Sequence, residues 1–407
     1  MKILYFGTVC NTENYSELLS KCKNKPSIST IVFETSLLGG LKQNSMDVEI
    51  HSFPMFPYFP SCKTLWFGKK TETISCGYKC CWLKTLNLPF LKQISRRINA
   101  RRIIKRWMKE NVKDGVVMTY SIPPFIVKDI VRLSKRFGVK TVAIVPDLLR
   151  DMYINENNIG FVAWLKQKYL DSAIKLQDKY DGYIYLTEAM SKVVAPGKPY
   201  VVMEGITDIT DLSLTVVEKI TPRVIMYAGM LHEKYGIINL LDAFEKQRFT
   251  DAELWLFGQG TAVPEIKKRA INDKRIKFFG VVPREKILEY ESAATLLVNP
   301  RSVYEEFTKY SFPSKTIEYM LSGTPLLTTK LEGIPNEYFD HCFSVNDNSV
   351  DELAKAIESA LSCSKSELNE IGYRARNFII SEKNAKKQSL KVINFVEEIV
   401  YDSTPER

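Results

Sequence analysis

The most informative stretch of the sequence is residues 312–325, Phe-Pro-Ser-Lys-Thr-Ile-Glu-Tyr-Met-Leu-Ser-Gly-Thr-Pro. Proline suits the first turn of a helix, because its φ is already helical and its missing N–H is not needed there. We therefore expect a helix whose first turn contains Pro313. Gly323 and Pro325 are expected to end it, since glycine caps helix ends and proline cannot continue them.

The start of this helix is suited to binding a phosphate. Ser314, Lys315 and Thr316 place polar side chains and backbone N–H donors at the positive end of the helix. Glu318 follows one turn later, where a carboxylate can accept hydrogen bonds from sugar hydroxyls. The pattern predicts a nucleotide-sugar site.

The composition is that of a globular protein with two domains. The chain has 407 residues, of which 45% are hydrophobic and 26% are charged, and this length allows two separate cores. No run approaches about 18 uninterrupted apolar residues, and residues 1–7 look like a first strand rather than a leader. We expect a cytoplasmic protein, with any membrane contact limited to a peripheral one at the inner face of the cell membrane.

The net charge of +10 is concentrated in one segment. Residues 53–110 contain 13 Lys and Arg but only 2 Asp and Glu, and include a helix-like run with Arg96, Arg97, Arg101 and Arg102. This run follows a loop rich in proline and aromatic residues, a combination that suits an anionic membrane surface or an anionic acceptor. The alternative is a solvated basic face beside a loop that packs on its own aromatic residues. Both interpretations stay open.

A metal site is not expected. The eight cysteines are scattered, and the cluster Cys76, Cys80 and Cys81 lacks both a Cys-x-x-Cys pair and a neighbouring histidine. We expect reduced thiols, as in most cytosolic proteins.

Two series of alternating strands and helices predict an α/β protein with two doubly wound, Rossmann-like domains facing across a cleft. In the first series, strands are expected at 3–7, 48–53, 116–119, 141–145, 182–186 and 200–203, with helices at 29–41, 123–137 and 160–180. The second has strands at 223–227, 253–257, 276–280, 295–298, 325–328 and 342–345, with helices at 236–246, 263–272, 284–291, 350–361, 366–380 and 385–402. We place the domains at 1–210, with an insert at 53–110, and at 211–384, and expect the helix at 385–407 to pack back on the first.

Two further strand ends carry glycine and lysine. The segment Tyr-Ala-Gly-Met-Leu-His-Glu-Lys-Tyr-Gly at 227–236 opens a helix, and Gly258-Gln259-Gly260 follows the next strand. Gly229 allows close backbone approach, and Lys234 can place a point charge on a diphosphate. A glycine turn alone is weak evidence, but with residues 314–316 these segments predict three loops around one phosphate site.

Residues 220–345 resemble the donor domain of retaining glycosyltransferases of family 4, which have the two-domain GT-B architecture. The resemblance rests on residues 227–236, Leu-Phe-Gly-Gln-Gly at 256–260, Phe-Phe-Gly-Val-Val-Pro at 278–283, Leu-Val-Asn-Pro at 297–300 and the stretch 312–325. The last of these resembles a branch common among bacterial enzymes that build surface polysaccharides. The first 200 residues match in architecture only, as expected of an acceptor-binding domain.

The resemblance implies roles for individual residues. Glu318 corresponds to the glutamate that holds the ribose hydroxyls, and Lys234 to a catalytic lysine on the donor diphosphate. Asp147, at a strand end, resembles part of an acceptor-side loop and is the second catalytic candidate. The expected donor-binding residues are Gly229, Lys234, Gly258, Gly260, Pro313, Ser314, Lys315, Thr316 and Glu318.

Two positions depart from the family's pattern. Tyr310 stands where many members have a second glutamate, although Glu305 and Glu306 lie nearby. Met230 replaces a frequent arginine, which leaves Lys234 to neutralise more of the diphosphate.

The resemblance implies a retaining glycosyltransferase that moves a hexosyl or N-acetylhexosaminyl group from a nucleoside diphosphate sugar, with a UDP-sugar favoured. The expected acceptor is a saccharide or lipid-linked saccharide in surface polysaccharide synthesis. No cofactor or metal is expected, because cations and backbone N–H groups stabilise the diphosphate leaving group. The alternatives are a sugar-nucleotide epimerase with the same donor site and a non-catalytic, basic nucleic-acid-binding protein, although no nucleic-acid partner is expected.

Overall fold

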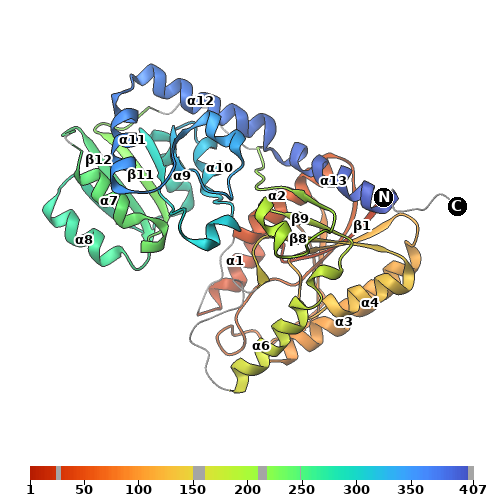
Figure 1. Ribbon diagram of the computed structural model, residues 1–407. Coiled ribbons are helices and arrows are strands. Elements are labelled where there is room, and N and C mark those ends of the chain that lie inside the picture. The colour runs from red at the N-terminus through yellow and green to blue at the C-terminus, as the bar shows by residue number, and fades with distance from the viewer. Residues whose placement is uncertain (24–28, 150–160, 210–217, 248, 402–407) are drawn as a thin grey trace. The chain divides into compact units, whose positions relative to one another are not determined.

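The structure is a computed structural model that describes residues 1–23, 29–149, 161–209, 218–247 and 249–401 (Figure 1). The chain forms two compact units. The first comprises Met1–Asp208 and Asn384–Arg407, and the second comprises Ile209–Lys383. The boundary expected between residues 210 and 211 lies outside the described residues.

The sheet of the first unit has eight strands in the order β10-β9-β8-β7-β1-β2-β5-β4. All neighbours pair in parallel except β4 and β5, which are antiparallel. The chain therefore winds outward from β1 in both directions. The strands are β1 (Lys2–Gly7), β2 (Asp47–Ser52), β4 (Thr71–Thr73), β5 (Lys79–Trp82), β7 (Gly115–Tyr120), β8 (Lys140–Val145), β9 (Gly182–Tyr185) and β10 (Tyr200–Val202).

The six strands predicted in this half are all confirmed, each within about one residue at either end. Sequence reasoning missed the strands of the insert, where β5 extends the sheet beyond β2 and β4 follows it. A separate pair, β3 (Trp66–Phe67) and β6 (Thr85–Leu86), is antiparallel. All four strands are too short to show a period, and β5 and β4 form because the open edge of the sheet at β2 offers them a partner.

Helices cover both faces of this sheet. One core contains residues of α1 (Thr12–Ser20), α2 (Ser29–Gln43) and α13 (Ala385–Tyr401). On the other face, α3 (Leu91–Glu110) packs against α4 (Val127–Phe137), and α6 (Phe161–Ile174) lies near both. Sequence reasoning missed α1, whose N-terminus is capped by the side chain of Asn11.

The last helix, α13, packs against α2 in the first unit. Gly40 permits the contact, because a Cβ there would lie 2.0 Å from the carbonyl oxygen of Ala385. The Asn44 side chain donates to the carbonyl oxygen of Lys386 at 2.9 Å, and the Gln388 side chain donates to that of Gly205 at 3.0 Å. The end of the chain is thus part of the first unit.

The sheet of the second unit has six parallel strands in the order β13-β12-β11-β14-β15-β16. All six had been predicted, but β11 and β12 run two or three residues further than expected, through Gly229 and Gly258. The strands are β11 (Arg223–Met230), β12 (Ala252–Gln259), β13 (Ile276–Gly280), β14 (Leu296–Asn299), β15 (Leu326–Thr329) and β16 (Phe343–Val345).

Helices also cover both faces of the second sheet. The core on one face contains residues of α7 (Ile237–Glu245), α8 (Val263–Asn272) and α11 (Val350–Ser362). The remaining helices are α9 (Arg284–Ala293), α10 (Lys315–Leu321) and α12 (Lys365–Glu382). α10 packs against α12 and ends before Gly323, whose φ of 76° is the left-handed value that closes a helix.

Within the described residues, no helix is long and apolar enough to cross a membrane. Among the same residues, no group of three or more His, Cys, Asp or Glu side chains could hold a metal ion. All eight cysteines are free thiols.

Candidate functional site

The predicted donor residues lie at the ends of strands of the second sheet or in the segments that follow these strands. β11 lies between β12 and β14, and all three strands are parallel, so their carboxyl ends lie at the same edge. The strand order reverses direction at β11, which makes this edge a topological switch point. In α/β proteins, ligands bind outside the carboxyl ends of the strands at such a point.

Two glycines let the loops at this edge approach each other backbone to backbone. Gly236 has a φ of 79°, and a Cβ there would lie 1.8 Å from the carbonyl oxygen of Pro300. Gly258 has a φ of 126°, and its Cβ would lie 1.8 Å from the carbonyl oxygen of Gly229. Larger residues would separate the loops. The predicted Gly229, Gly258 and Gly260 are therefore at the switch point, and Gly258 lets β12 end tightly against β11.

Lys234 lies in the loop after β11, in a short 3-10 helix, η3 (Glu233–Tyr235). Its Nζ is 5.3 Å from the centroid of the Phe307 ring and 5.6 Å from that of Tyr235. Within the described residues, no carboxylate forms an ion pair with Lys234. Aromatic faces hold an ammonium without neutralising it, so the charge is available to an anion.

Sequence reasoning missed Arg301, which directly follows Pro300 after β14. Its guanidinium lies 4.9 Å from the centroid of the Tyr235 ring, the ring that Lys234 also approaches. Burial lowers the pKa of Arg301, but a guanidinium stays charged at neutral pH. No carboxylate in the described part of the chain pairs with it either. The available signal was its position, as a basic residue immediately after a predicted strand end.

The helix predicted within residues 312–325 is present but begins later. α10 starts at Lys315, so the placement of Pro313 in its first turn is corrected: Pro313 is buried ahead of the helix, and its carbonyl accepts a hydrogen bond of 2.8 Å from the N–H of Thr316. The Thr316 side chain is fully buried and its N–H is occupied, while its hydroxyl has no hydrogen-bond partner in the described residues, so its contact with phosphate stays a prediction. Ser314 is exposed and remains a candidate.

The charge of Lys315 is paired within the second unit. Its Nζ pairs with the carboxylate of Glu318 and lies 3.5 Å from Oε1 of Glu291. Glu318 also pairs with Nη2 of Arg284 at 2.8 Å. Burial opposes the ionisation of Glu318, but the charges of Lys315 and Arg284 outweigh it and lower the pKa of Glu318. Glu318 is therefore an anion at neutral pH, and a carboxylate with two partners has lone pairs left for hydroxyl groups.

Sequence reasoning also missed Glu291, on α9 beside this pair. Its side chain is fully buried, and neither carboxyl oxygen has a hydrogen-bond partner in the described part of the chain. Burial and the charge of Glu318 raise the pKa of Glu291 to about 8. No sequence signal pointed to it, because a glutamate within a charged helical run is expected to face solvent.

The position of the second family glutamate is occupied by a half-buried Tyr310, directly after the short helix η4 (Glu306–Lys309). Glu305 is half-buried and Glu306 is exposed in the same loop. The loop thus carries two carboxylates, but neither stands at residue 310.

The expected acceptor-side residues belong to the first unit. Asp147 lies two residues beyond β8, and its side chain is exposed at the carboxyl edge of the sheet. Lys234, the other predicted catalytic residue, belongs to the second unit.

The prediction that Arg96 contacts a membrane or acceptor is corrected. Arg96 is only 3% exposed, and its Nη2 donates to the carbonyl oxygen of Pro54 at 2.8 Å. Its Nε donates to Oγ1 of Thr85 at 3.2 Å. Arg96 faces the insert rather than solvent, because it lies on the side of α3 that packs against residues 53–86. It holds the proline-rich opening of the insert in place.

The other three predicted arginines of α3 are exposed. Arg97 pairs with the carboxylate of Asp129 at 2.7 Å, and Arg101 lies 3.8 Å from it. Asp129 is only 1% exposed and also pairs with Arg132 at 3.3 Å. One buried carboxylate thus faces three exposed guanidinium groups, which leaves this surface positively charged. Arg102 is exposed further along the same helix.

Comparison with known proteins supports this description. Residues 222–363 match the family model described as glycosyl transferases group 1. No curated protein matches the chain.

Solved structures resemble the whole chain. Sucrose-phosphate synthase from Thermosynechococcus elongatus has a TM-score of 0.65 and 14% identity, covering 99% of this chain and 100% of that one. Alr3699/HepE of Anabaena, in complex with UDP, has a TM-score of 0.60 and 14% identity, covering 98% and 100%. A mutant of S. aureus TarM, in complex with fondaparinux, alpha-GlcNAc-glycerol and UDP, has a TM-score of 0.61 and 10% identity, covering 97% and 99%.

At these identities the structural likeness establishes the fold. It confirms the predicted α/β class with two Rossmann-like units, whereas the cleft between them stays a prediction. The chain has the GT-B fold, and the match to the glycosyl transferases group 1 model lies within its second unit.

Proposed function

We propose that the chain is a glycosyltransferase whose donor is a nucleoside diphosphate sugar, with a UDP-sugar favoured. The observation that carries the proposal is the charge arrangement in the second unit. An ionised Glu318 lies in the same unit as two cations, Lys234 and Arg301, for which the described residues offer no carboxylate. The match to the group 1 family model supports the reaction class, and the HepE and TarM complexes with UDP support the donor.

Each charged group has a distinct role in this proposal. Glu318 accepts hydrogen bonds from the ribose hydroxyls, held in place by Lys315 and Arg284. Lys234 and Arg301 bind the diphosphate, because Tyr235 positions both without neutralising them. Arg301 thereby supplies a guanidinium that the sequence lacks at Met230.

The two cations also favour the chemical step. When the bond between the anomeric carbon and the phosphate oxygen breaks, negative charge grows on the departing diphosphate, and fixed positive charges stabilise it. We propose that the acceptor oxygen attacks the same face of an oxocarbenium-like sugar, so that configuration is retained, and that its proton passes to a donor phosphate oxygen. Asp147 is the candidate for positioning the acceptor. Since Lys234 and Arg301 neutralise the diphosphate, UDP should bind in the presence of EDTA.

The acceptor is proposed to be a saccharide or a lipid-linked saccharide used in surface polysaccharide synthesis, at the cytoplasmic side of the membrane. The TarM complex contains saccharide ligands beside UDP, which supports an acceptor of this class. The transferred group is proposed to be a hexosyl or N-acetylhexosaminyl residue, on the resemblance of residues 312–325 to the bacterial branch.

Calorimetric titration with UDP tests the donor site. Hydrogen bonds to a charged group contribute about 1.5 to 3 kcal/mol, so Glu318→Ala should weaken UDP binding roughly 10- to 150-fold. Arg301→Ala should weaken it as well. The matched control is Glu306→Ala, because Glu306 is exposed on the preceding loop. The assignment is wrong if Glu318→Ala binds UDP as tightly as the wild type does.

Product analysis separates a transferase from an epimerase. With a UDP-sugar alone, an epimerase converts the donor sugar to its epimer, whereas a transferase gives at most slow hydrolysis to UDP and sugar. Accumulation of the epimer without acceptor would contradict the proposal.

A further inference from the structure

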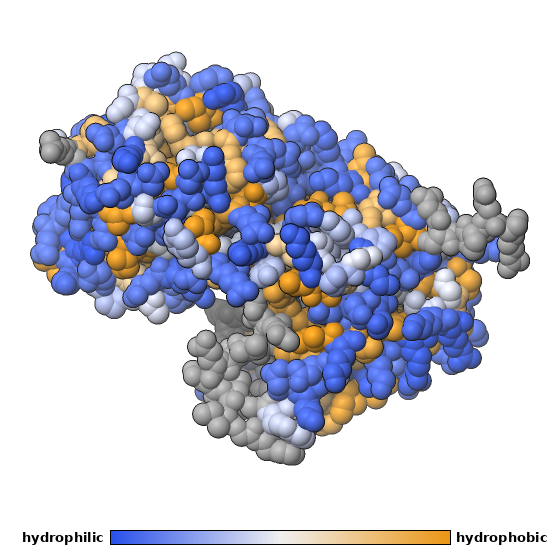
Figure 2. All heavy atoms as spheres, viewed as in Figure 1, coloured by the Kyte–Doolittle hydropathy of each residue, from blue (hydrophilic) through white to orange (hydrophobic). Residues whose placement is uncertain are grey.

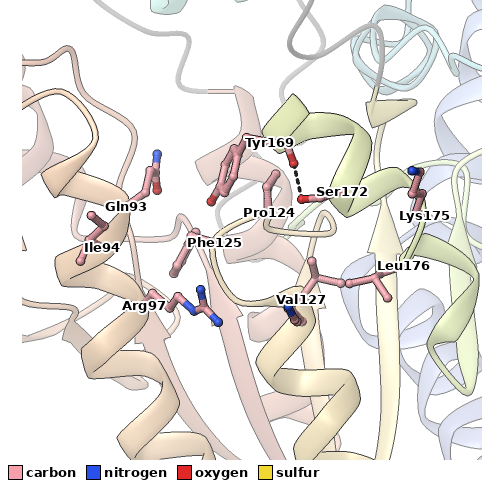
Figure 3. A pocket seen from close by; sticks show the side chains of 11 residues that line it. Gln93, Ile94, Arg97, Pro124, Phe125, Val127, Tyr169, Ser172, Lys175 and Leu176 are labelled. Atoms are coloured by element: carbon pink, nitrogen blue, oxygen red, sulfur yellow. Dashed lines mark hydrogen bonds between the residues drawn. The ribbon is translucent and has the colours of Figure 1, made fainter. Parts of the chain in front are cut away.

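A cavity in the first unit has no part in the donor site. Its volume is about 530 Å³, and it lies among α3, α4 and α6 (Figure 3). This is within the range of about 300 to 1,000 Å³ typical of ligand pockets. Pro124 and Phe125, which border it, follow the carboxyl end of β7. The cavity is therefore at the edge of the first sheet where an α/β unit binds its ligand.

The walls of the cavity are largely apolar. Ile94 comes from α3, Val127 from the start of α4 and Leu176 from the segment after α6, and Figure 3 shows them arranged around Pro124 and Phe125. Apolar walls of this extent hold hydrocarbon in preference to water, because contact with water is unfavourable for both. A sugar with a hydroxyl on almost every carbon would leave its hydrogen bonds unmade against such walls.

Positive charge borders these walls. Arg97, Lys128 and Lys175 line the cavity and are exposed. Lys128 and Lys175 have no ion pair with a carboxylate in the described part of the chain, and Arg97 shares Asp129 with two further arginines. The lining residues include no Asp or Glu. The site thus combines an apolar interior with an excess of cationic groups.

An exposed apolar surface continues from the cavity along α3. Ile94 is 52% exposed although it lines the cavity, and Phe90, Leu91 and Ile98 are similarly exposed. Residues 90, 94 and 98 recur at helical spacing and therefore share one side of α3. In Figure 2, apolar residues are exposed beside hydrophilic ones over the lower part of the first unit, where Figure 1 places α3 and α6. An exposed apolar surface with a polar border is typical of a contact with a partner or a membrane.

Two residues with a positive φ precede segments that line the cavity. Phe90 has a φ of 61° directly before α3, and Ser121 has a φ of 62° directly after β7. Such left-handed values are unfavourable for residues with a side chain and concentrate at functional sites. Phe90 precedes α3 with its aromatic ring half exposed. Ser121 lies between β7 and the lining residues Pro124 and Phe125.

We propose that this cavity binds the hydrocarbon chain of a phosphorylated lipid, with the phosphate on Arg97, Lys128 and Lys175. In the proposed function, this lipid is the carrier of the acceptor saccharide, so that part of the inference rests on the proposed activity. The exposed apolar side of α3 places the cavity against the membrane that holds the lipid. Hydrophobic walls and cations together select for such a ligand, because a free sugar phosphate lacks the chain and a neutral lipid lacks the phosphate.

Binding of farnesyl phosphate to the purified full-length chain, measured by calorimetry, tests this inference. Each buried methylene should raise affinity roughly fourfold, so farnesyl phosphate should bind at least 100-fold more tightly than inorganic phosphate. Farnesol should bind more weakly than its phosphate. Ile94→Gln and Ser172→Trp, both at exposed positions that line the cavity, should weaken binding at least tenfold. Lys128→Ser with Lys175→Ser should reduce the preference for the phosphate over farnesol.

The matched control is Ile98→Gln, one turn along the same helix at a comparable exposure but outside the cavity. It should bind farnesyl phosphate like the wild type. The inference is overturned if farnesyl phosphate binds no more tightly than inorganic phosphate, or if Ile94→Gln and Ile98→Gln weaken binding equally, which would indicate general surface adsorption. UDP titration of the same samples tests the donor site separately. If the wild type does not bind UDP, the donor site is refuted, whereas the result for farnesyl phosphate is unaffected.

Discussion

Replacing Glu291 by Gln is expected to make the stability of the second unit less dependent on pH. Glu291 is fully buried on α9, with Nζ of Lys315 3.5 Å from its Oε1. Burial and the nearby charge of Glu318 raise its pKa to about 8, whereas an unfolded glutamate has a pKa of about 4.3. Glutamine has nearly the same shape as the protonated acid and does not titrate in this range.

The sign and size of the pH dependence of the free energy of unfolding follow from proton linkage. Between the two pKa values the folded chain holds a proton that the unfolded chain has released, so the free energy of unfolding falls as pH rises. The slope approaches about 1.4 kcal/mol per pH unit, or about 4 kcal/mol from about pH 5 to about pH 8. Because Glu291 and Glu318 interact closely, the two carboxyl groups titrate as a pair, and we expect a smaller loss of about 2 to 3 kcal/mol in the wild type. Below about pH 4.5 the contribution vanishes.

Urea unfolding of both proteins at several pH values between about 5 and 8 measures this effect. The stability of Glu291→Gln relative to the wild type should increase steadily with pH. Glu289→Gln is the control, because Glu289 is exposed on the same helix and pairs only with Lys286, also exposed, in the described residues. A constant difference between Glu291→Gln and the wild type across this range would refute the argument.

Three further substitutions or reactions test the packing described above. Gly258→Ala should destabilise the second unit by about 2 to 4 kcal/mol, because its Cβ would overlap the carbonyl oxygen of Gly229. Gly280→Ala, also at positive φ but with space for a Cβ, should cost only about 1 kcal/mol in the same unfolding assay. Equal losses of stability in the two variants would argue against the overlap. Arg96→Met should destabilise the first unit by about 2 to 4 kcal/mol through the loss of its buried hydrogen bonds. Arg102→Met, at an exposed position, should change stability by less than about 0.5 kcal/mol. Similar effects of the two substitutions would mean that Arg96 does not stabilise the fold. The hydrogen bond with His51 lowers the pKa of Cys81, whereas burial raises that of Cys76, so iodoacetamide should label Cys81 several-fold faster near neutral pH. Peptide mass spectrometry gives the two rates, and His51→Gln should reduce the difference between them. An unchanged difference in that variant would refute the role of His51.

The aromatic residues of the basic insert divide into packed and exposed ones, and the membrane interpretation of the insert stays a prediction. Phe56 and Phe67 pack with ring centroids 4.3 Å apart, and Trp82 lies 6.3 Å from Phe67, as the interpretation of a loop packed on its own aromatic residues requires. Trp66 is exposed instead, as is Phe90 beyond it. The alternation of a two-residue strand places Trp66 and Phe67 on opposite faces, and composition alone cannot distinguish them.

Most of the fold could be predicted because its signals are local. Parallel strands buried on both faces appear as short apolar runs, and the helices between them carry their own period and caps. The donor residues could be predicted for a related reason. Lys234, Gly258 and Glu318 each follow a strand or open a helix, so the positions of the strands imply that these loops meet at one edge.

The remaining features depended on partners distant in the sequence. Glu291 has the composition of a surface residue, and it is buried because α9 lies beside α10 and its Lys315. Arg301 is a candidate because Tyr235, from another loop, lies close to both Arg301 and Lys234. α10 begins at Lys315, and Pro313 ahead of it is buried.

Arg96 and Arg97 show most directly where sequence stops being sufficient. They are chemically identical neighbours on one helix, and the local sequence is enough to predict that both lie on a basic helix. Successive residues of a helix point about 100° apart, so one guanidinium reaches the carbonyl oxygen of Pro54 inside the insert and the other reaches Asp129 at the surface. Only the tertiary structure decided which arginine supports the fold and which borders the cavity, because burial depends on what the rest of the chain places against each side of the helix.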